Sequence, residues 1–223
     1  MIAVIDYGVG NLFSLTASLK YLGADVKVTG EKEDIEAADR IILPGVGAFA
    51  DAKEKLDQTG LVDTILEQTA GGKPLLGICL GMQLLFEESH EYGVHKGLGL
   101  IKGTIASIDA DLKKAGIEGL KVPHIGWNAL QFDEDEPLFR YNKQGDHVYY
   151  VHSFYGTDCR ESTIATSEYG VTITGAVRDV YKRQQRISVC TCRSATKWIW
   201  RSCGKQHGET ARQSGSIRAI MIR

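Results

Sequence analysis

The sequence predicts an α/β fold with a mostly parallel central sheet flanked by helices and an added portion of antiparallel strands. In the first half, short apolar runs alternate with segments whose apolar residues repeat at helical spacing. Several of these runs end in turns that contain glycine. In the second half, after residue 97, strand-like runs follow one another with turns between them, which is typical of antiparallel strands.

The first ninety residues account for the parallel sheet. Short apolar runs predict strands at residues 2–6, 25–29, 40–44 and 74–79. Leucines recur at helical spacing over residues 12–22, and Gly23 is suited to end that helix. Similar patterns predict helices at residues 48–58, 61–69 and 80–88. Strands joined by helices run parallel and are covered on both faces.

The remaining expected strands form the antiparallel portion. They are expected at residues 101–108, 129–132, 147–154, 162–167 and 171–177.

Length and composition are those of a folded protein. The chain has 223 residues, of which 43% are hydrophobic and 24% charged, so a sizeable core can form. No apolar run reaches the roughly 18–20 residues that a membrane span needs. The N-terminus lacks a basic segment followed by a small-residue cleavage site, and five cysteines without such a signal indicate reduced thiols. We therefore expect a cytoplasmic protein.

Charge divides the chain in two. Residues 1–179 carry a net charge of -11, whereas residues 180–223 carry +9 with one acidic residue. The second stretch also holds three of the five cysteines and two of the three tryptophans. We therefore expect a domain boundary near residue 179, followed by a basic tail with no helical or strand period.

The strongest chemical signal is the sequence Gly-Ile-Cys-Leu-Gly at residues 77–81. It lies between an expected strand and an expected helix, as in a nucleophile elbow. Cys79 would then lie at the carboxyl edge of the sheet and at a helix N-terminus, which favours the thiolate. A thiolate there attacks a carbonyl carbon, and backbone N–H groups from Leu80 onward can face the developing oxyanion. The alternative is a small buried cysteine flanked by glycines for packing.

A second glycine-rich strand end supports the elbow interpretation. Residues 44–47 read Pro-Gly-Val-Gly directly after an apolar strand. Two such loops at one sheet edge can form an oxyanion pocket together. The alternative for Gly45 and Gly47 is an ordinary turn between a strand and a helix.

These segments resemble a known family. Residues 77–89 are similar to the class I, triad-type glutamine amidotransferases. Four further segments resemble one branch of that family, the glutaminase subunits of imidazole glycerol phosphate synthase: residues 6–11, 44–49, 123–128 and 149–154. The resemblance covers about residues 1–179, and the set of five motifs is far more specific than any one of them.

The resemblance implies a glutamine site. Cys79 matches the nucleophile, Gly47 and Leu80 match the oxyanion-binding backbone, and Gln83 matches a residue that holds glutamine. The backbone of His152, Ser153 and Phe154 matches a strand that binds the α-amino and carboxylate groups, and His152 is not the catalytic base in the family.

The resemblance also implies a partner and products. Asn11 and Trp127 match segments that face a cyclase subunit with a (β/α)8 barrel, in a heterodimer. The family reaction hydrolyses L-glutamine to glutamate and ammonia, and the cyclase uses the ammonia to make imidazole glycerol phosphate and AICAR. Neither a metal nor an organic cofactor is implied, nor binding to nucleic acid or a membrane. We expect activity to depend on the partner, since a mobile loop at Gly45 and Gly47 can leave the oxyanion hole unformed.

The family's catalytic base is missing from its expected place. The strand after residue 177 should lead to a His-x-Glu pair, but the match stops at Arg178. Residues 179–184 equal the translation of the end sequence of a common transposon-based sequencing adaptor, so we hypothesise a frame that runs into unrelated DNA. His207 and Glu209 have the right spacing but lie some twenty residues too late, and we do not assign them. The chain as written is therefore expected to be nearly inactive and poorly stable.

Three alternatives remain open at this stage. The chain could be a glutaminase that serves another synthase, for pyridoxal phosphate or guanylate, although residues 6–11 and 123–128 argue against this. It could be a non-catalytic subunit that docks to the cyclase and keeps Cys79 as a relic. The basic tail could be a real appendage that binds nucleic acid, but this does not explain the lost pair.

Other candidate residues have structural interpretations. His90, His95 and His147 are interpreted as surface or hydrogen-bonded histidines, and Cys159 as structural. Without the family match, Trp127 would be expected in the core. The acidic run at residues 133–136 is expected to be a solvated turn rather than a metal site.

Overall fold

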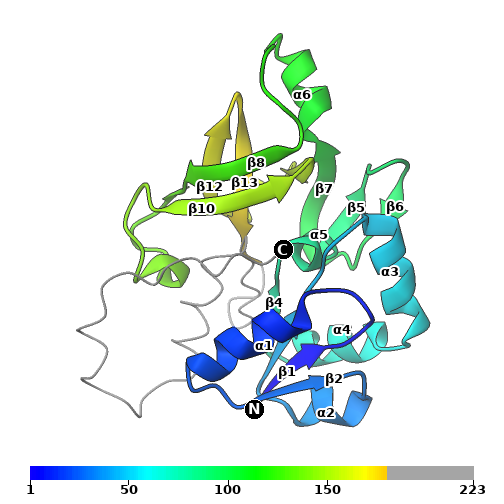
Figure 1. Ribbon diagram of the computed structural model, residues 1–223. Helices are drawn as coiled ribbons and strands as arrows, with labels where there is room; N and C mark the ends of the chain where they lie inside the picture. Colours follow the sequence, from blue (N-terminus) through cyan, green and yellow to red (C-terminus); the bar gives the residue numbers. More distant parts are fainter. Residues whose placement is uncertain (180–223) are drawn as a thin grey trace.

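A parallel sheet forms the centre of the N-terminal half in the computed structural model, which describes residues 1–179 (Figure 1). Its order is β2-β1-β3-β4, with every pair parallel. The strands are β1 (Ile2–Ile5), β2 (Val26–Thr29), β3 (Arg40–Leu43) and β4 (Leu75–Gly77). All residues of β1 and β4 are buried, as expected for strands covered on both faces. The predicted α/β class and the four parallel strands are confirmed.

The two faces of this sheet belong to two hydrophobic clusters. Ile41 and Leu43 of β3 point into the cluster that contains α2 (Lys32–Ala37), α3 (Phe49–Gln58) and α4 (Val62–Ala70). Ile42, between them, points into the other cluster, which contains α1 (Leu12–Tyr21) and the antiparallel portion. The antiparallel strands therefore pack on the parallel sheet through a shared core. The helix α2 was not predicted.

The predicted helix over residues 80–88 is wrong. The helix α5 (Leu80–Gln83) is only one turn long, and it is followed by the strand β5 (Phe86–Ser89). Buried Leu84 and Leu85 use their carbonyl groups to bond the backbone N–H groups of residues 98, 100 and 101. A Cβ atom on Gly97 would lie 2.0 Å from the Phe86 carbonyl oxygen, so the two backbones are in close contact. These long-range bonds compete with helix propagation and end α5.

Two antiparallel sheets and one mixed sheet complete the described residues. Their orders are β11-β7-β5-β6, β10-β8 and β13-β12-β9. The remaining elements are β6 (His95–Lys96), β7 (Ile101–Ser107), α6 (Ile108–Lys114), β8 (His124–Ala129), β9 (Gln131–Phe132), the 3-10 turn η1 (Pro137–Phe139), β10 (His147–His152), β11 (Phe154–Thr157), β12 (Thr163–Tyr169) and β13 (Val171–Val177). The predicted antiparallel addition is confirmed. Helix α6 and most of β8 were not predicted.

The acidic run was only partly interpreted correctly. Residues 133–135 are exposed, but Glu136 is buried and accepts hydrogen bonds from the Leu138 N–H and from Arg178. Its Oε2 atom lies 2.8 Å from Arg178 Nη1. Burial of this carboxylate is tolerated because it has a charged partner from the end of β13.

No helix within residues 1–179 combines the length and the hydrophobicity that a membrane span requires.

Candidate active site

Cys79 occupies a strained turn between β4 and α5. Its backbone has φ 55° and ψ -115°, a combination that favours glycine and is costly for cysteine. A Cβ atom on Gly81 would lie 2.0 Å from the Leu43 carbonyl oxygen, and one on Gly77 would lie 2.7 Å from the Gly81 carbonyl oxygen. Both glycines are therefore required by close backbone packing. The turn presents Cys79 at the carboxyl edge of the parallel sheet, at the start of α5.

The loop after β3 lies directly against this turn. A Cβ atom on Gly45 would lie 2.5 Å from the Gly81 nitrogen, so the two glycine-rich turns are in contact. Beyond Gly45 the loop becomes accessible: Val46 is 53% exposed, and exposed Gly47 has φ 93°. The structure thus brings the Gly47 loop and the Cys79 turn to one edge of the sheet.

Two side chains anchor the ends of that loop. The Tyr7 hydroxyl donates a 2.6 Å hydrogen bond to the Pro44 carbonyl oxygen. The Phe49 N–H donates a 2.7 Å bond to Glu91 Oε2. Burial raises the pKa of Tyr7, and the nearby negative charge of a Cys79 thiolate raises it further, so Tyr7 remains a neutral donor. Residues 45–48 are therefore held at both ends.

Gln83 connects the nucleophile turn to β11. It lies four residues after Cys79, and its Nε2 atom donates a 3.2 Å hydrogen bond to the Phe154 carbonyl oxygen. His152 Nδ1 lies 2.9 Å from the same oxygen. The Ser153 carbonyl oxygen accepts from the Ile108 N–H. Gln83, His152 and Phe154 therefore form one hydrogen-bonded group.

The hydrogen bonds of His152 exclude it as the base for Cys79. Its Nδ1 atom faces the Phe154 carbonyl oxygen, and its Nε2 atom lies 3.1 Å from His124 Nδ1. Burial lowers the pKa of His152 to about 4, with a smaller contribution from His124. Both ring nitrogens of His152 are hydrogen-bonded to partners other than the Cys79 thiol. His152 therefore cannot accept the proton of that thiol without losing its bond to His124 or to the Phe154 carbonyl oxygen.

The low pKa of His152 predicts a loss of stability in weak acid. The unfolded chain binds the proton near pH 6.5, whereas the folded chain resists it down to about pH 4. The stabilisation is therefore complete above pH 6.5 and is lost as the pH falls toward 4. Urea unfolding at pH 4.5 should give a free energy of unfolding about 2 kcal/mol lower than at pH 7. The variant His152→Gln should flatten this difference, while exposed His147→Gln should retain it; equal slopes in both variants would contradict the assignment.

Asn11 and Trp127, the two expected partner-facing residues, lie at the N-cap of α1 and on β8. Asn11 caps α1, since its side-chain oxygen accepts from the Ser14 N–H at 3.1 Å. Trp127 is 47% exposed on β8, and its ring lies 5.5 Å from that of Tyr149 on β10. Core placement, the interpretation that Trp127 would have had without the family match, is therefore wrong.

Sequence reasoning missed three residues that shape the site: Tyr7, Glu91 and His124. Tyr7 and His124 lie within segments already singled out, residues 6–11 and 123–128, but their partners could not be inferred from the chain. Glu91 lies in a turn with no recognisable motif. His207, Glu209 and the basic tail lie outside the described residues.

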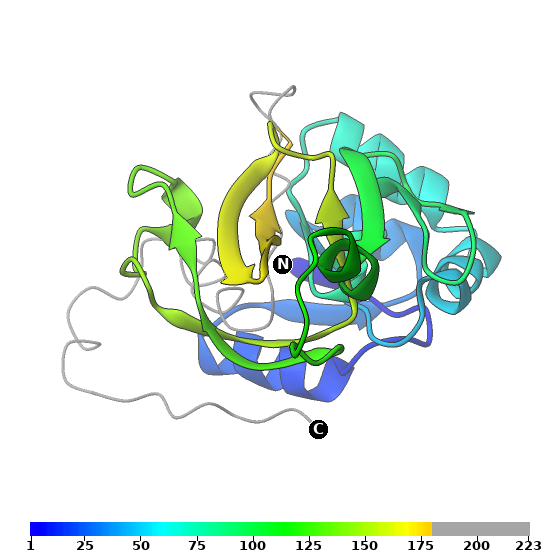
Figure 2. The same cartoon turned by 90° about the horizontal axis from the view of Figure 1, so that it is seen from above.

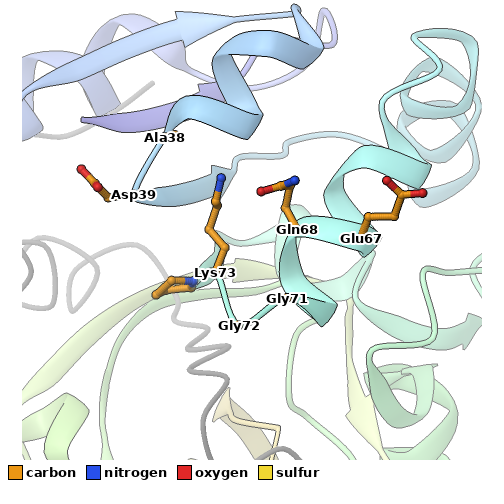
Figure 3. A pocket seen from close by; sticks show the side chains of 8 residues that line it. Ala38, Asp39, Glu67, Gln68, Gly71, Gly72 and Lys73 are labelled. Atoms are coloured by element: carbon orange, nitrogen blue, oxygen red, sulfur yellow. The ribbon is translucent and has the colours of Figure 1, made fainter.

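A separate cavity lies at the opposite edge of the sheet. It has a volume of about 360 Å³ and is lined by residues around Lys73 and Pro74, which precede β4, whereas Cys79 follows it (Figure 3). Lys73 Nζ donates to the Ile35 and Glu36 carbonyl oxygens near the end of α2. This lysine therefore serves packing between α2 and α4 rather than the nucleophile.

Comparisons with known proteins identify the family to which the chain is similar. A model of the family "Glutamine amidotransferase class-I" matches residues 3–185. The imidazole glycerol phosphate synthase subunit HisH of Geobacillus kaustophilus is 48% identical over 178 residues, which cover 79% of this chain and 83% of that protein. HisH of Bacillus subtilis is 45% identical over 187 residues, which cover 82% and 87%. A crystal structure of a glutamine amidotransferase matches with a TM-score of 0.62 at 17% identity, covering 85% of this chain and 88% of that one, and supports the fold.

The parallel sheet and the strained cysteine turn at its carboxyl edge define an α/β protein with a candidate cysteine nucleophile. The chain belongs to the class I glutamine amidotransferase family and, within it, to the HisH subunits of imidazole glycerol phosphate synthase. The resemblance that the motifs predicted is confirmed.

Proposed function

We propose that residues 1–179 form the amidotransferase domain of a glutaminase subunit, with Cys79 as its nucleophile. The subunit hydrolyses L-glutamine and supplies ammonia to a cyclase subunit, which makes imidazole glycerol phosphate and AICAR in histidine biosynthesis. The observation that carries the proposal is the strained Cys79 turn at the sheet edge, in a chain 48% identical to a HisH subunit. Strain at a non-glycine residue marks functional sites because folding alone does not favour it.

The proposed chemistry follows from the order of groups around Cys79. The thiolate attacks the side-chain carbonyl carbon of glutamine, and the resulting oxyanion faces the N–H of Leu80 and the backbone of Gly47. A general acid protonates the departing nitrogen, the C–N bond breaks, and ammonia leaves a γ-glutamyl thioester on Cys79. The conjugate base then takes a proton from water, which attacks the thioester; the C–S bond breaks, and glutamate and the Cys79 thiolate are released. Gln83 and the backbone of residues 152–154 hold the rest of the substrate.

The loop geometry supports the role given to Gly47. Its φ of 93° is accessible to glycine at little cost, and it lies in the exposed part of a loop anchored at Pro44 and Phe49. Anchored ends allow a peptide between them to reorient without displacing β3 or α3. The expectation that the partner controls this reorientation remains a proposal.

We infer that residues 1–179 do not supply a base for this chemistry. His124 and His152, the two histidines of the hydrogen-bonded group that includes Gln83, are bonded to each other. Residues 178–185, where the family match ends, contain no His-x-Glu pair. Without a group that returns a proton to the departing ammonia, turnover should be negligible. We propose that the residues after the family match, which ends at residue 185, are not part of the amidotransferase domain.

The rate of ammonia release from glutamine tests directly whether the chain lacks a catalytic base. The full chain should release ammonia at least about a thousandfold more slowly than the HisH subunit of Geobacillus kaustophilus, with or without that subunit's cyclase partner. Comparable rates would show that the chain contains a base that the sequence comparison missed.

Sequencing the gene from uncloned genomic DNA across codons 170–200 tests the origin of the tail. The frame is expected to continue after Arg178 into a strand that carries the His-x-Glu pair. If the genomic DNA encodes the same residues as the present chain, the result would instead favour a non-catalytic subunit that docks to the cyclase.

We further propose that the ribbon of β8 and β10 faces the cyclase subunit. Its cross-strand pairs Ile125 with Val151 and Trp127 with Tyr149 leave four large apolar side chains 39–58% exposed on one face. Figure 2 shows this ribbon and α1, which Asn11 caps, along the same side of the molecule. Apolar, aromatic surfaces of this kind are typical of protein interfaces.

Trp127→Ala is expected to weaken binding to the cyclase subunit at least about tenfold, because a central aromatic side chain contributes strongly to an interface. Titration calorimetry with the Geobacillus kaustophilus cyclase subunit measures the dissociation constant. The matched control is Tyr92→Ala, which removes an aromatic side chain that is 90% exposed on the turn between β5 and β6. Equal weakening by both substitutions, or by neither, would contradict the proposed face.

A further inference from the structure

We infer that His124 and His152 form a hydrogen-bonded relay that fixes the orientation of the Gln83 amide beside Cys79. This inference rests on the proposed function, because it takes Gln83 as part of the glutamine site. His124 and His152 are positioning residues in this account: they act through the Phe154 carbonyl group and Gln83.

The two histidines are directly opposite each other in the β8–β10 ladder. His124 Nδ1 lies 3.1 Å from His152 Nε2, and His152 Nδ1 lies 2.9 Å from the Phe154 carbonyl oxygen. Gln83 Nε2 donates to the same oxygen at 3.2 Å. Three hydrogen bonds therefore connect β8 to the helix that begins at the nucleophile.

The proton positions in this relay follow from one fixed acceptor. A carbonyl oxygen can only accept, so His152 Nδ1 must carry a proton. In a neutral ring, His152 Nε2 is then an acceptor, and His124 Nδ1 must be the donor to it. Both rings therefore carry a proton on Nδ1. Burial lowers the pKa of both rings, which is consistent with neutral imidazoles.

The same logic orients Gln83. The two lone pairs of the Phe154 carbonyl oxygen are used by His152 and by the Gln83 amide nitrogen. Because the Gln83 amide nitrogen is used in this bond, the Oε1 atom of Gln83 is the atom that can accept a hydrogen bond from an N–H group of the substrate glutamine. A flipped Gln83 would place two N–H donors toward the substrate instead. The Phe154 carbonyl group therefore decides which end of the Gln83 amide faces the substrate, and the histidine relay holds that carbonyl group in place.

Packing holds the first ring of the relay in place. His124 is 3% exposed, and its ring is stacked 3.8 Å from Tyr169 and 4.8 Å from Tyr150. Stacking on both rings fixes the plane in which Nδ1 points at His152. The neighbouring residues Ile125 and Val151 point to the exposed face of the ribbon, so the relay lies directly behind the proposed docking face.

Nitrogen-15 NMR of the full chain tests the tautomers without any substitution. At pH 7, His124 and His152 should both show neutral rings with the proton on Nδ1. A proton on Nε2 of His152 would overturn the inference, because the bond to the Phe154 carbonyl oxygen would then be impossible.

Two variants test the effect on the site. The probe is the chloroketone analogue of L-glutamine, whose chloride leaves without a proton when the Cys79 thiolate displaces it and a C–S bond forms. His124→Phe removes the donor to His152 and should slow this alkylation of Cys79 about tenfold. His124→Asn places an amide donor near the position of Nδ1 and should restore the rate to within about threefold of the unmodified chain.

Alkylation of Cys79 by iodoacetamide, which does not use the glutamine site, separates positioning from general damage. Its rate should be unchanged in both variants, and thermal unfolding reports whether each is folded. Equal chloroketone rates in His124→Phe and the unmodified chain would overturn the inference. If the unmodified chain shows no glutamine-protected alkylation, the proposed function fails, and the NMR tautomers alone then decide whether the relay exists.

Discussion

Gly81→Ala is expected to lower the free energy of unfolding by more than about 3 kcal/mol, the largest effect we expect of any single substitution. The added Cβ atom would lie 2.0 Å from the Leu43 carbonyl oxygen, and that oxygen is a backbone atom of a fully buried residue, so it cannot move aside. The same turn would lose its contact with Gly45, and Cys79 would no longer be presented at the sheet edge. Urea unfolding monitored by circular dichroism measures the change.

Gly71→Ala is the matched control for Gly81→Ala. Gly71 has φ -73°, and a Cβ atom there would meet its neighbours at 3.4 Å, an ordinary contact. This substitution should change the free energy of unfolding by less than about 0.5 kcal/mol. Similar losses in the two variants would show that the contact between the turns is not as close as the structure indicates.

Cys79→Gly is expected to stabilise the protein while it removes the nucleophile. Glycine adopts the φ of 55° without the steric cost that cysteine pays, whereas alanine keeps that cost. Cys79→Gly should therefore be about 1–2 kcal/mol more stable than Cys79→Ala, and neither variant should react with the glutamine chloroketone at residue 79.

The comparison with alanine removes the effect of losing the thiol, because both variants lack it. Thermal or urea unfolding of the two variants under identical conditions provides the measurement. If Cys79→Ala were as stable as Cys79→Gly, the turn would carry no strain, and the trade-off between stability and function at this position would be refuted.

The sequence was most informative where structure depends on neighbouring residues. The parallel strands and the Cys79 turn were predictable because apolar runs, glycines and the cysteine are adjacent in the chain. The apolar segment at residues 84–86 fits a helix or a strand equally well, and bonds to residues 98–101 decide for the strand. Local pattern could not supply those partners.

In the candidate site, too, residues in local motifs could be predicted, whereas residues that act through distant partners could not. The roles proposed for Cys79, Gln83 and Gly47 could be predicted because these residues lie in recognisable sequence motifs. Glu91 acts through a bond to Phe49, 42 residues away. Buried Glu136 pairs with Arg178, which is also 42 residues away in the chain. The pairing of His124 with His152 depends on the register of β8 and β10, which no local pattern specified.

The most direct test of the central claim is the rate at which the glutamine chloroketone alkylates Cys79, followed by mass spectrometry of its peptide. We predict alkylation at Cys79 that excess L-glutamine slows and D-glutamine does not, while buried Cys159 remains unmodified. Alkylation of Cys79 that is insensitive to L-glutamine, or absent while the protein is folded, would contradict the claim that Cys79 is the nucleophile of a glutamine site.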